Sequence, residues 1–229
     1  MHPTSKVVNK HMFPVFDKPM IFYAIEALRD AGITDIVITL GDYDAERFFQ
    51  LLGDGSELGV KLDYHYHGSP KGIAYAINMC RNRLEGEPFA VHLGDNIFCG
   101  GVKQVVDEFN GYKCDGAIVT KMFPDDKMKN YGVLCDDGDG MKAVEKPNNL
   151  DEYENVMGAI LGFYIFNDRF FKFYEKISPS NRGEYEITDM INLLLDDLIG
   201  VQYEDDWFDC GQFEDLYQAS TWRRNHTLT

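Results

Sequence analysis

The first half of the chain alternates between two hydrophobic patterns. Between Pro19 and Gly32 apolar residues fall near helical spacing, which predicts a helix over residues 19–31. Residues 35–40 (DIVITL) form a short β-branched run, which is typical of a strand. The same criteria predict helices over 45–52, 72–84 and 102–109, and strands over 61–66, 89–93 and 116–122. Strand–helix alternation with short loops indicates parallel strands covered by helices on both faces.

The hydrophobic pattern changes after Pro124. Two apolar segments, 133–135 and 141–145, flank a stretch rich in Gly and Asp and predict a hairpin. The remaining pattern predicts strands over 158–166, 201–203 and 207–208, and helices over 168–177, 187–195 and 213–224. We therefore expect one α/β domain over residues 1–229, with a Rossmann-like, mixed but mainly parallel sheet and helices on both faces.

The charge and hydropathy of the chain exclude some partners. The formal net charge is −16 over 229 residues, whereas nucleic-acid binding draws its affinity from basic residues that neutralise phosphates. Nucleic acid is therefore not an expected partner, although one small phosphate ligand needs only a few local cations. No apolar run approaches the roughly 20 residues that span a bilayer, so no membrane partner is expected either.

The cysteine pattern bears on the redox compartment. The five cysteines are an odd number and contain no C-x-x-C pair, which indicates neither a zinc ribbon nor a disulfide framework. The N-terminus has no apolar signal-peptide core. The expected location is therefore the reducing cytoplasm.

Two acidic residues follow short apolar strands. Asp95 comes two residues after the strand over 89–93, and ligands of open parallel sheets lie beyond such strand ends. Asp209 follows Trp207-Phe208, just before the last helix. Each has a structural alternative, a turn for Asp95 and a helix N-cap for Asp209. Together the two carboxylates suit Mg²⁺, which is usually held by one or two carboxylates plus substrate phosphates.

Four basic residues are candidate phosphate ligands: Lys10, Lys18, Lys146 and Arg182. The planar guanidinium of Arg182, in a loop before a helix, matches phosphate geometry best. A solvated surface position is the alternative for any single lysine.

Two other metal-like patterns are weaker. Residues 136–140 (DDGDG) resemble the start of a calcium loop, but the twelfth position is Pro147 instead of Glu. His65 and His67 alternate on a strand without a clear third ligand, so a surface or packing role is the alternative to metal binding.

These segments together resemble the glucose-1-phosphate nucleotidyltransferases, particularly the thymidylyltransferases. The resemblance is carried, in family order, by residues 5–6, 9–20 (NKHMFPVFDKPM), 51–56 (LLGDGS), 69–74 (SPKGIA), 93–98 (LGDNIF), 131–133 (YGV), 145–147 (EKP), 182–189 (RGEYEITD) and 209–211 (DCG). It spans nearly the whole chain. It implies one nucleotidyltransferase domain, with a nucleotide-binding half over 1–123 and a sugar-phosphate-binding half over 124–229.

The resemblance also implies roles for individual residues. Asp95 and Asp209 match the magnesium-binding aspartates of the family, so Mg²⁺ is the expected cofactor. Lys10 matches a lysine that contacts the triphosphate, and it is expected to be catalytic together with Arg182. The expected substrate-binding residues are His67, Gly72, Asn96, Gly132, Glu145, Lys146, Tyr164 and Arg182.

The implied substrates are a nucleoside triphosphate and a sugar-1-phosphate. An oxygen of the sugar phosphate attacks the α-phosphorus of the triphosphate, and pyrophosphate leaves. The nucleophile is already anionic, so positioning and charge neutralisation supply the rate without a general base.

Two departures from the family pattern bear directly on catalysis and on the choice of base. Members of the family begin with a buried strand and a Gly-rich turn ending in Arg, whereas residues 1–4 match the family positions immediately after that Arg. We expect an upstream strand and loop in the natural protein; the alternative is a chain with impaired catalysis. His67 stands where thymidylyltransferases carry a base-reading Gln, so dTTP, the expected substrate, is not separated from UTP and CTP.

A second function is compatible with the same fold. A non-catalytic nucleotide-sugar-binding or regulatory subunit would need the fold without the Gly-rich loop, although the retained aspartates speak against it. A third candidate, a glycosyltransferase, also places metal-bound carboxylates at strand ends, but residues 145–147 and 182–184 favour the nucleotidyltransferase. A homo-oligomer is compatible with the enzyme interpretation.

Overall fold

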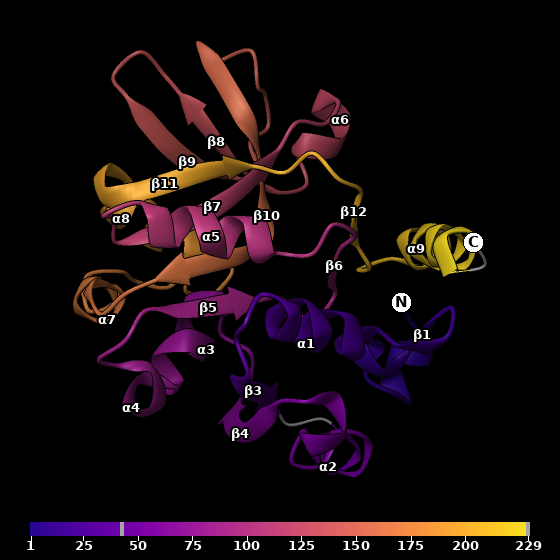
Figure 1. The fold of residues 1–229 in the computed structure, drawn as a ribbon. Coiled ribbons are helices and arrows are strands. Elements are labelled where there is room, and N and C mark those ends of the chain that lie inside the picture. The colour runs from indigo at the N-terminus through magenta and orange to yellow at the C-terminus, as the bar shows by residue number, and fades with distance from the viewer. Residues whose placement is uncertain (42–43, 228–229) are drawn as a thin grey trace. The chain divides into compact units, whose positions relative to one another are not determined.

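The computed structural model describes residues 1–41 and 44–227 (Figure 1). The chain forms two compact units built from interleaved segments. The first unit consists of Met1–Gly68, His92–Gln104 and Asp205–Thr229, and the second of Ser69–Val91 and Val105–Glu204. The segments of each unit come from both sides of the expected boundary at 123/124. The nucleotide and sugar halves are statements about ligands and stay predictions.

The described part of the first unit contains two short antiparallel strand pairs, a parallel pair of strands and three longer helices. Its strands are β1 (Pro14–Val15), β2 (Lys18–Pro19), β3 (Asp35–Gly41), β4 (Lys61–Gly68), β6 (Asn96–Phe98) and β12 (Trp207–Asp209). Its helices are η1 (Thr4–Lys6), η2 (Lys10–Met12), α1 (Met20–Asp30), α2 (Ala45–Leu52), η3 (Ser56–Leu58) and α9 (Phe213–Thr227). β3 and β4 pair in parallel, whereas β1 pairs with β2 and β6 with β12 antiparallel.

Local sequence explains the boundaries of α1. Its buried residues, Met20, Ile21, Ala24, Ile25 and Leu28, recur at helical spacing and form one apolar stripe. Gly32, with φ +88°, stands just after the helix, and its N–H donates to the carbonyl of Arg29. This left-handed position is the usual helix stop, since glycine adopts it without steric cost.

The second unit is built around a six-stranded sheet. Its strands are β5 (Phe89–His92), β7 (Gly116–Lys121), β8 (Gly132–Asp136), β9 (Met141–Glu145), β10 (Asn155–Phe166) and β11 (Leu198–Gln202). Its helices are α3 (Ile73–Met79), α4 (Arg81–Leu84), α5 (Lys103–Gly111), α6 (Asp125–Met128), α7 (Arg169–Tyr174), α8 (Ile187–Leu194) and η4 (Leu195–Asp197). The sheet order is β11-β7-β10-β8-β9, and β5 also pairs with β10.

The sheet of the second unit mixes strand directions. β11 lies parallel to β7, whereas β10 is antiparallel to both β7 and β8, and β8 is antiparallel to β9. The predicted mixed α/β class is confirmed, but antiparallel pairs outnumber the parallel pair described in this sheet, contrary to the expected mainly parallel arrangement. The antiparallel ladders follow from the predicted hairpin and from the long strand β10, while β3–β4 and β11–β7 supply the parallel pairs.

An aromatic cluster fills the core of the second unit. Phe166, Phe170 and Phe171 are fully buried, and the ring of Phe89 lies 5.5–6.3 Å from all three. Such offset and edge-to-face ring pairs stabilise a core beyond the area they bury. This core holds β5, β10 and α7 together.

The predicted elements need two corrections, one to a helix and one for a strand that was not predicted. The helix predicted over 72–84 is two helices, α3 and α4, because the backbone leaves the helical region at Cys80 (φ −91°, ψ 7°). The short strand β6 directly after Asp95 was not predicted, since three residues are too few for a periodic pattern.

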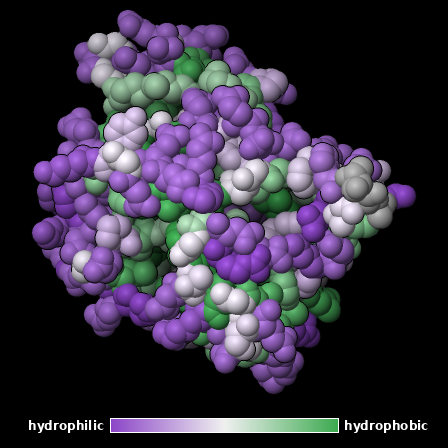
Figure 2. Space-filling model, viewed as in Figure 1, coloured by the Kyte–Doolittle hydropathy of each residue, from purple (hydrophilic) through white to green (hydrophobic). Residues whose placement is uncertain are grey.

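The polarity of the surface, the hydropathy of the helices and the state of the cysteines can be compared with what the composition indicates. The face drawn in Figure 2 is mostly hydrophilic, with smaller apolar patches between the polar residues. Within residues 1–41 and 44–227, no helix combines the length and the apolar character that a membrane span requires. All five cysteines are free thiols.

Candidate active site

An antiparallel ladder in the first unit brings two distant segments together at Asp95 and Asp209. β6 pairs with β12 so that Asp209 lies opposite Asn96 and Trp207 opposite Phe98. The backbone N–H of Cys210 also donates to the carbonyl of Asp95 at 2.8 Å. Asp95, directly before β6, and Asp209, the last residue of β12, therefore lie at the same end of this strand pair.

Each carboxylate oxygen of Asp95 has its own hydrogen-bond donor. Lys10 Nζ donates to Oδ2 at 2.5 Å, and Asn96 Nδ2 donates to Oδ1 at 3.0 Å. The Asp95 side chain is only 16 % exposed. Charge-assisted bonds of this kind fix the orientation of a buried carboxylate.

The two aspartates have opposite electrostatic environments. Burial is the largest influence on the pKa of Asp95 and would raise it, but Lys10 and His11 outweigh burial and hold this pKa below its ordinary value. Burial, reinforced by the negative charge of Asp95, raises the pKa of Asp209 to about 6. The pair therefore carries negative charge that a cation would neutralise.

A short helical turn positions Lys10. The turn η2 begins after Asn9, whose side chain accepts a hydrogen bond from the backbone N–H of His11 at 3.1 Å. The backbone N–H of Asn9 in turn donates to Asp44 Oδ2 at 2.7 Å. His11 lies in the middle of this turn, and the desolvation of its ring lowers its pKa, against the opposing effect of Asp95. The turn thus holds Lys10 against Asp95 from two anchors.

The carboxylate pair fits a magnesium ion by its chemistry. Among residues 1–41 and 44–227, no group of three or more His, Cys, Asp or Glu side chains could enclose a metal. Magnesium does not need such a cage, because it keeps several waters and is usually held by one or two carboxylates plus substrate phosphates. Asp95 and Asp209 supply that donor set.

In the second unit, the hairpin β8–β9 gathers three of the expected sugar-site residues. Gly132 lies opposite Glu145, and Lys146 follows directly, with Nζ 3.3 Å from Glu145 Oε1. Lys146 has φ +47°, a left-handed conformation that is rare for a side chain larger than glycine. A Cβ on Gly132 would lie 2.8 Å from Thr188 Cγ2 and 3.4 Å from Glu145 Oε2. No larger residue fits at position 132 without displacing these groups.

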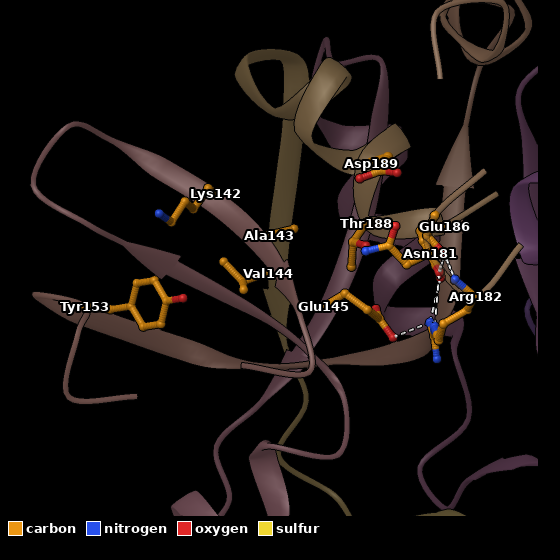
Figure 3. Close-up of a pocket in the computed structure, with 11 residues that line it drawn as sticks. Lys142, Ala143, Val144, Glu145, Tyr153, Asn181, Arg182, Glu186, Thr188 and Asp189 are labelled. Carbon is orange, nitrogen blue, oxygen red and sulfur yellow. Dashed lines mark hydrogen bonds and ion pairs between the residues drawn. The ribbon is translucent and has the colours of Figure 1, made fainter. Parts of the chain in front are cut away.

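Carboxylates hold the guanidinium of Arg182 in a fixed orientation (Figure 3). Arg182 Nε and Nη2 donate to the two oxygens of Glu186 at 3.2 and 2.8 Å, a two-pronged bond. Nη2 also donates to Glu145 Oε1 at 3.1 Å, and Ser180 Oγ donates to Glu186 Oε1 at 2.6 Å. These contacts leave other N–H groups of the guanidinium for a ligand.

A cavity of about 450 Å³ lies along β9 and the loop before α8. Its lining includes Glu145, Arg182 and Thr188 near one end and Tyr153 with Lys142 near the other, as Figure 3 shows. Carboxylate, hydroxyl and guanidinium groups around one cavity can bind a polyhydroxylated, negatively charged ligand.

The remaining expected residues have varied surroundings. Tyr164 is buried in β10 (3 % exposed), with its ring centroid 6.0 Å from that of Phe166, so it is a core residue of the second unit. Its contact with a sugar stays a prediction. Lys18, one of the candidate phosphate ligands, forms an ion pair with Glu26 instead, and its Nζ lies 4.3 Å from the ring centroid of Tyr23.

Two further residues occupy special backbone positions. His67 lies at an irregularity near the end of β4, where the pairing with β3 shifts register. Gly72 has φ +96°, and a Cβ there would lie 2.4 Å from the carbonyl oxygen of Tyr185. Packing against Tyr185 thus requires glycine at position 72, whatever its relation to a bound base.

Sequence reasoning did not identify four residues that orient these groups. They are Asn9, Ser180, Glu186 and Trp207. Asn9 carries a detectable signal, since Asn is a favoured residue before a helical turn. Glu186 stands four residues after Arg182, but in a loop that spacing does not imply contact.

Comparisons with known proteins agree with one another. The model of the nucleotidyl transferase family matches residues 1–225. The chain is 34 % identical over 223 residues to the low-salt glycan biosynthesis nucleotidyltransferase Agl11 of Haloferax volcanii. It is 31 % identical over 223 residues to glucose-1-phosphate thymidylyltransferase of Streptomyces griseus. Each alignment covers 96 % of this chain and 61 % of the relative, so the chain spans about three fifths of their length.

A solved structure shows the same architecture. The Bacillus anthracis protein described under the name glucose-1-phosphate thymidylyltransferase superposes with a TM-score of 0.87 at 31 % identity. The match covers 98 % of this chain and 90 % of that one.

Proposed function

Because the chain belongs to the nucleotidyl transferase family, we propose that it joins glucose-1-phosphate to a nucleoside triphosphate, with dTTP expected, and releases pyrophosphate. The observation that carries the proposal is the cluster in the first unit, where two strand-end aspartates and Lys10 converge. Relatives named as glucose-1-phosphate thymidylyltransferases support the choice of sugar phosphate and base.

The reaction forms one phosphorus–oxygen bond and breaks another. A phosphate oxygen of glucose-1-phosphate attacks the α-phosphorus, the bond from that phosphorus to the bridging oxygen breaks, and pyrophosphate leaves with the bonding electrons. The nucleophile is already charged, so no residue needs to remove a proton from it. The residues instead have to align two anions and offset their repulsion.

Asp95, Asp209 and Lys10 would act on the triphosphate. A magnesium ion held by the two carboxylates would neutralise phosphate charge and orient the α-phosphate. The ammonium group of Lys10 has three N–H donors and uses one of them on Asp95, so two can face phosphate oxygens. Its contact with Asp95 keeps it from rotating away before the triphosphate arrives.

Arg182, Lys146 and Glu145 would act on the sugar phosphate. The orientation of Arg182 is set by Glu186 before any ligand binds, which limits the entropy lost when phosphate is bound. Glu145 can accept hydrogen bonds from sugar hydroxyls, and the absence of a side chain at Gly132 lets Glu145 and Thr188 lie close to the β8 backbone. A site built to bind a particular hydroxyl discriminates against sugars that lack it.

His67 bears on the choice of base. An imidazole offers one donor or one acceptor toward a pyrimidine edge, whereas an amide offers both. We therefore expect a dTTP preference over UTP and CTP that is smaller than that of an enzyme with glutamine at this position. The free thiols agree with the cytoplasmic location that we propose.

A pyrophosphate-release assay tests the function. The protein is incubated with glucose-1-phosphate, Mg²⁺ and dTTP, UTP or CTP in separate reactions, and turnover is expected to be fastest with dTTP. Asp95→Asn is expected to reduce the rate by about 10²-fold or more, while the exposed Asp151→Asn serves as the control with the same change of charge. Binding of a nucleotide-sugar without any turnover would instead support the non-catalytic alternative.

A further inference from the structure

We propose that Trp207 positions the carboxylate of Asp95 through the side-chain amide of Asn96. The proposal rests on the proposed function in taking Asp95 as a ligand of metal and phosphate. Trp207 touches neither reactant in this account, so it is a positioning residue.

A continuous chain of hydrogen bonds connects the three side chains. The indole Nε1–H of Trp207 donates to Asn96 Oδ1 at 3.1 Å, and Asn96 Nδ2 donates to Asp95 Oδ1 at 3.0 Å. Asn96 and Trp207 are almost completely buried, at 4 % and 5 % exposed. Bonds in such an environment are stronger than in water and expensive to leave unmade.

The indole decides which end of the Asn96 amide faces Asp95. An asparagine amide can rotate by half a turn, which exchanges its carbonyl oxygen and its amino group. Indole nitrogen is a donor only, so it selects the orientation in which Oδ1 faces Trp207. The amino group is then directed at Asp95. In the reverse orientation the carbonyl oxygen would face a carboxylate, and two acceptors would repel each other.

The orientation of the amide determines which oxygen of Asp95 remains available. With Oδ1 held by Asn96, Oδ2 is the oxygen that faces Lys10. The ladder adds rigidity, since Trp207 and Asp209 are on the same strand, β12, and pair with Phe98 and Asn96 of β6. One strand therefore supplies both the second carboxylate and the group that orients the first.

The chain contains its own control for this proposal. Trp222, the other of its two tryptophans, also donates its indole N–H to a side chain. Its acceptor is a carboxylate oxygen, Asp206 Oδ2, at 2.8 Å. Trp207→Phe and Trp222→Phe remove the same donor and keep an aromatic ring. Only the first change affects the hydrogen-bond chain to Asp95.

The first measurement needs no metal and no activity. The two indole N–H groups give two signals in a ¹⁵N–¹H correlation spectrum, which the two Trp→Phe variants assign. Asp95→Asn, made in the otherwise unchanged protein, is expected to shift the Trp207 signal and to leave the Trp222 signal in place. An unmoved Trp207 signal would show that Asp95 and Trp207 are not coupled, and would overturn the proposal.

The second measurement is the affinity for Mn²⁺ alone, followed by electron paramagnetic resonance. Loss of a group that orients a metal ligand typically weakens metal binding by 10- to 100-fold, so Trp207→Phe is expected to raise the Kd for Mn²⁺ by about tenfold or more. Trp222→Phe is expected to leave it within twofold. If Trp207→Phe lowers the free energy of unfolding but binds Mn²⁺ like the parent, Trp207 has a packing role only and the proposal is wrong.

These outcomes are distinct from failure of the proposed function. A protein that releases no pyrophosphate, yet shows the indole shift and the selective loss of Mn²⁺ affinity, would retain the positioning role and lose the assigned reaction. A protein that turns over normally with Trp207→Phe, with unchanged kcat and KM, would lose the positioning role and retain the reaction.

Discussion

Replacing Asp209 by asparagine should stabilise the metal-free protein. The ionised side chain is buried beside Asp95, which raises the pKa of Asp209 from 3.8 to about 6. A pKa difference of one corresponds to about 1.4 kcal/mol, so at neutral pH the ionised group destabilises the fold by about 3 kcal/mol. Asparagine keeps the shape and removes the charge. We therefore expect Asp209→Asn to raise the free energy of unfolding by up to about 3 kcal/mol at neutral pH.

The pH dependence has a definite sign. The folded state binds the Asp209 proton more tightly than the unfolded state, so this contribution to stability is complete below the ordinary pKa of 3.8 and is lost as pH rises through about 6. The advantage of Asp209→Asn should thus be small, about 0.5 kcal/mol, at about pH 4 and complete at about pH 7.5.

Urea denaturation with a chelator present measures this effect. Parent and variant are compared at both pH values, and Asp151→Asn serves as the control because Asp151 is exposed. The control is expected to change the free energy of unfolding by less than about 0.5 kcal/mol. An Asp209→Asn protein no more stable than the parent at neutral pH, or equally stabilised at both pH values, would refute the electrostatic argument.

Added Mg²⁺ should favour the stability of the parent over that of Asp209→Asn. An ion that binds only the folded state stabilises it in proportion to the logarithm of its concentration above the Kd. We expect Mg²⁺ to raise the midpoint of denaturation of the parent and to leave Asp209→Asn nearly unchanged. Equal stabilisation of both proteins would remove Asp209 from the metal site.

Three further changes test other parts of the structure. Gly72→Ala should destabilise the protein by about 2 kcal/mol or more, because its Cβ would meet the backbone of Tyr185 and its φ is positive. Lys146→Gly should be more stable than Lys146→Ala by about 1 kcal/mol, since only glycine adopts φ +47° without strain, while both lose activity. Asn192→Ala should cost about 2 kcal/mol, because the Asn192 amide bonds both the N–H and the carbonyl of Ala143 on the edge strand β9. Chemical denaturation measures all three, with pyrophosphate release for Lys146. Gly72→Ala at parental stability, equal stabilities of the Lys146 variants, or an Asn192→Ala change below about 0.5 kcal/mol would each contradict its own argument.

The local pattern of apolar residues was sufficient to predict most of the longer helices and strands. The helical spacing before Gly32 and the β-branched run over 35–40 depend on neighbours in sequence, and α1 and β3 have almost the predicted bounds. The same local logic pointed to Asp95 and Asp209, because polar residues directly after apolar strands tend to be directed toward a crevice. The structure brings them to neighbouring positions.

Long-range pairing could not be predicted in the same way. The bond between Trp207 and Asn96 joins residues 111 positions apart, and no periodicity in either segment indicates it. Whether Tyr164 faces a ligand or the core depends on which strands flank β10, which is a property of the whole sheet. The fork between Arg182 and Glu186 likewise depends on a loop conformation that composition does not specify.

The carboxylates around Arg182 also bear on which anions this arginine would bind. Its guanidinium already donates to Glu145 and Glu186, so an incoming anion must bind the remaining N–H groups beside two carboxylates. A phosphate monoester has nearly two negative charges at neutral pH and three strong acceptor oxygens. An uncharged sugar or a single carboxylate offers the guanidinium less negative charge and fewer strong acceptor oxygens. We therefore expect Arg182 to favour phosphorylated sugars over unphosphorylated ones.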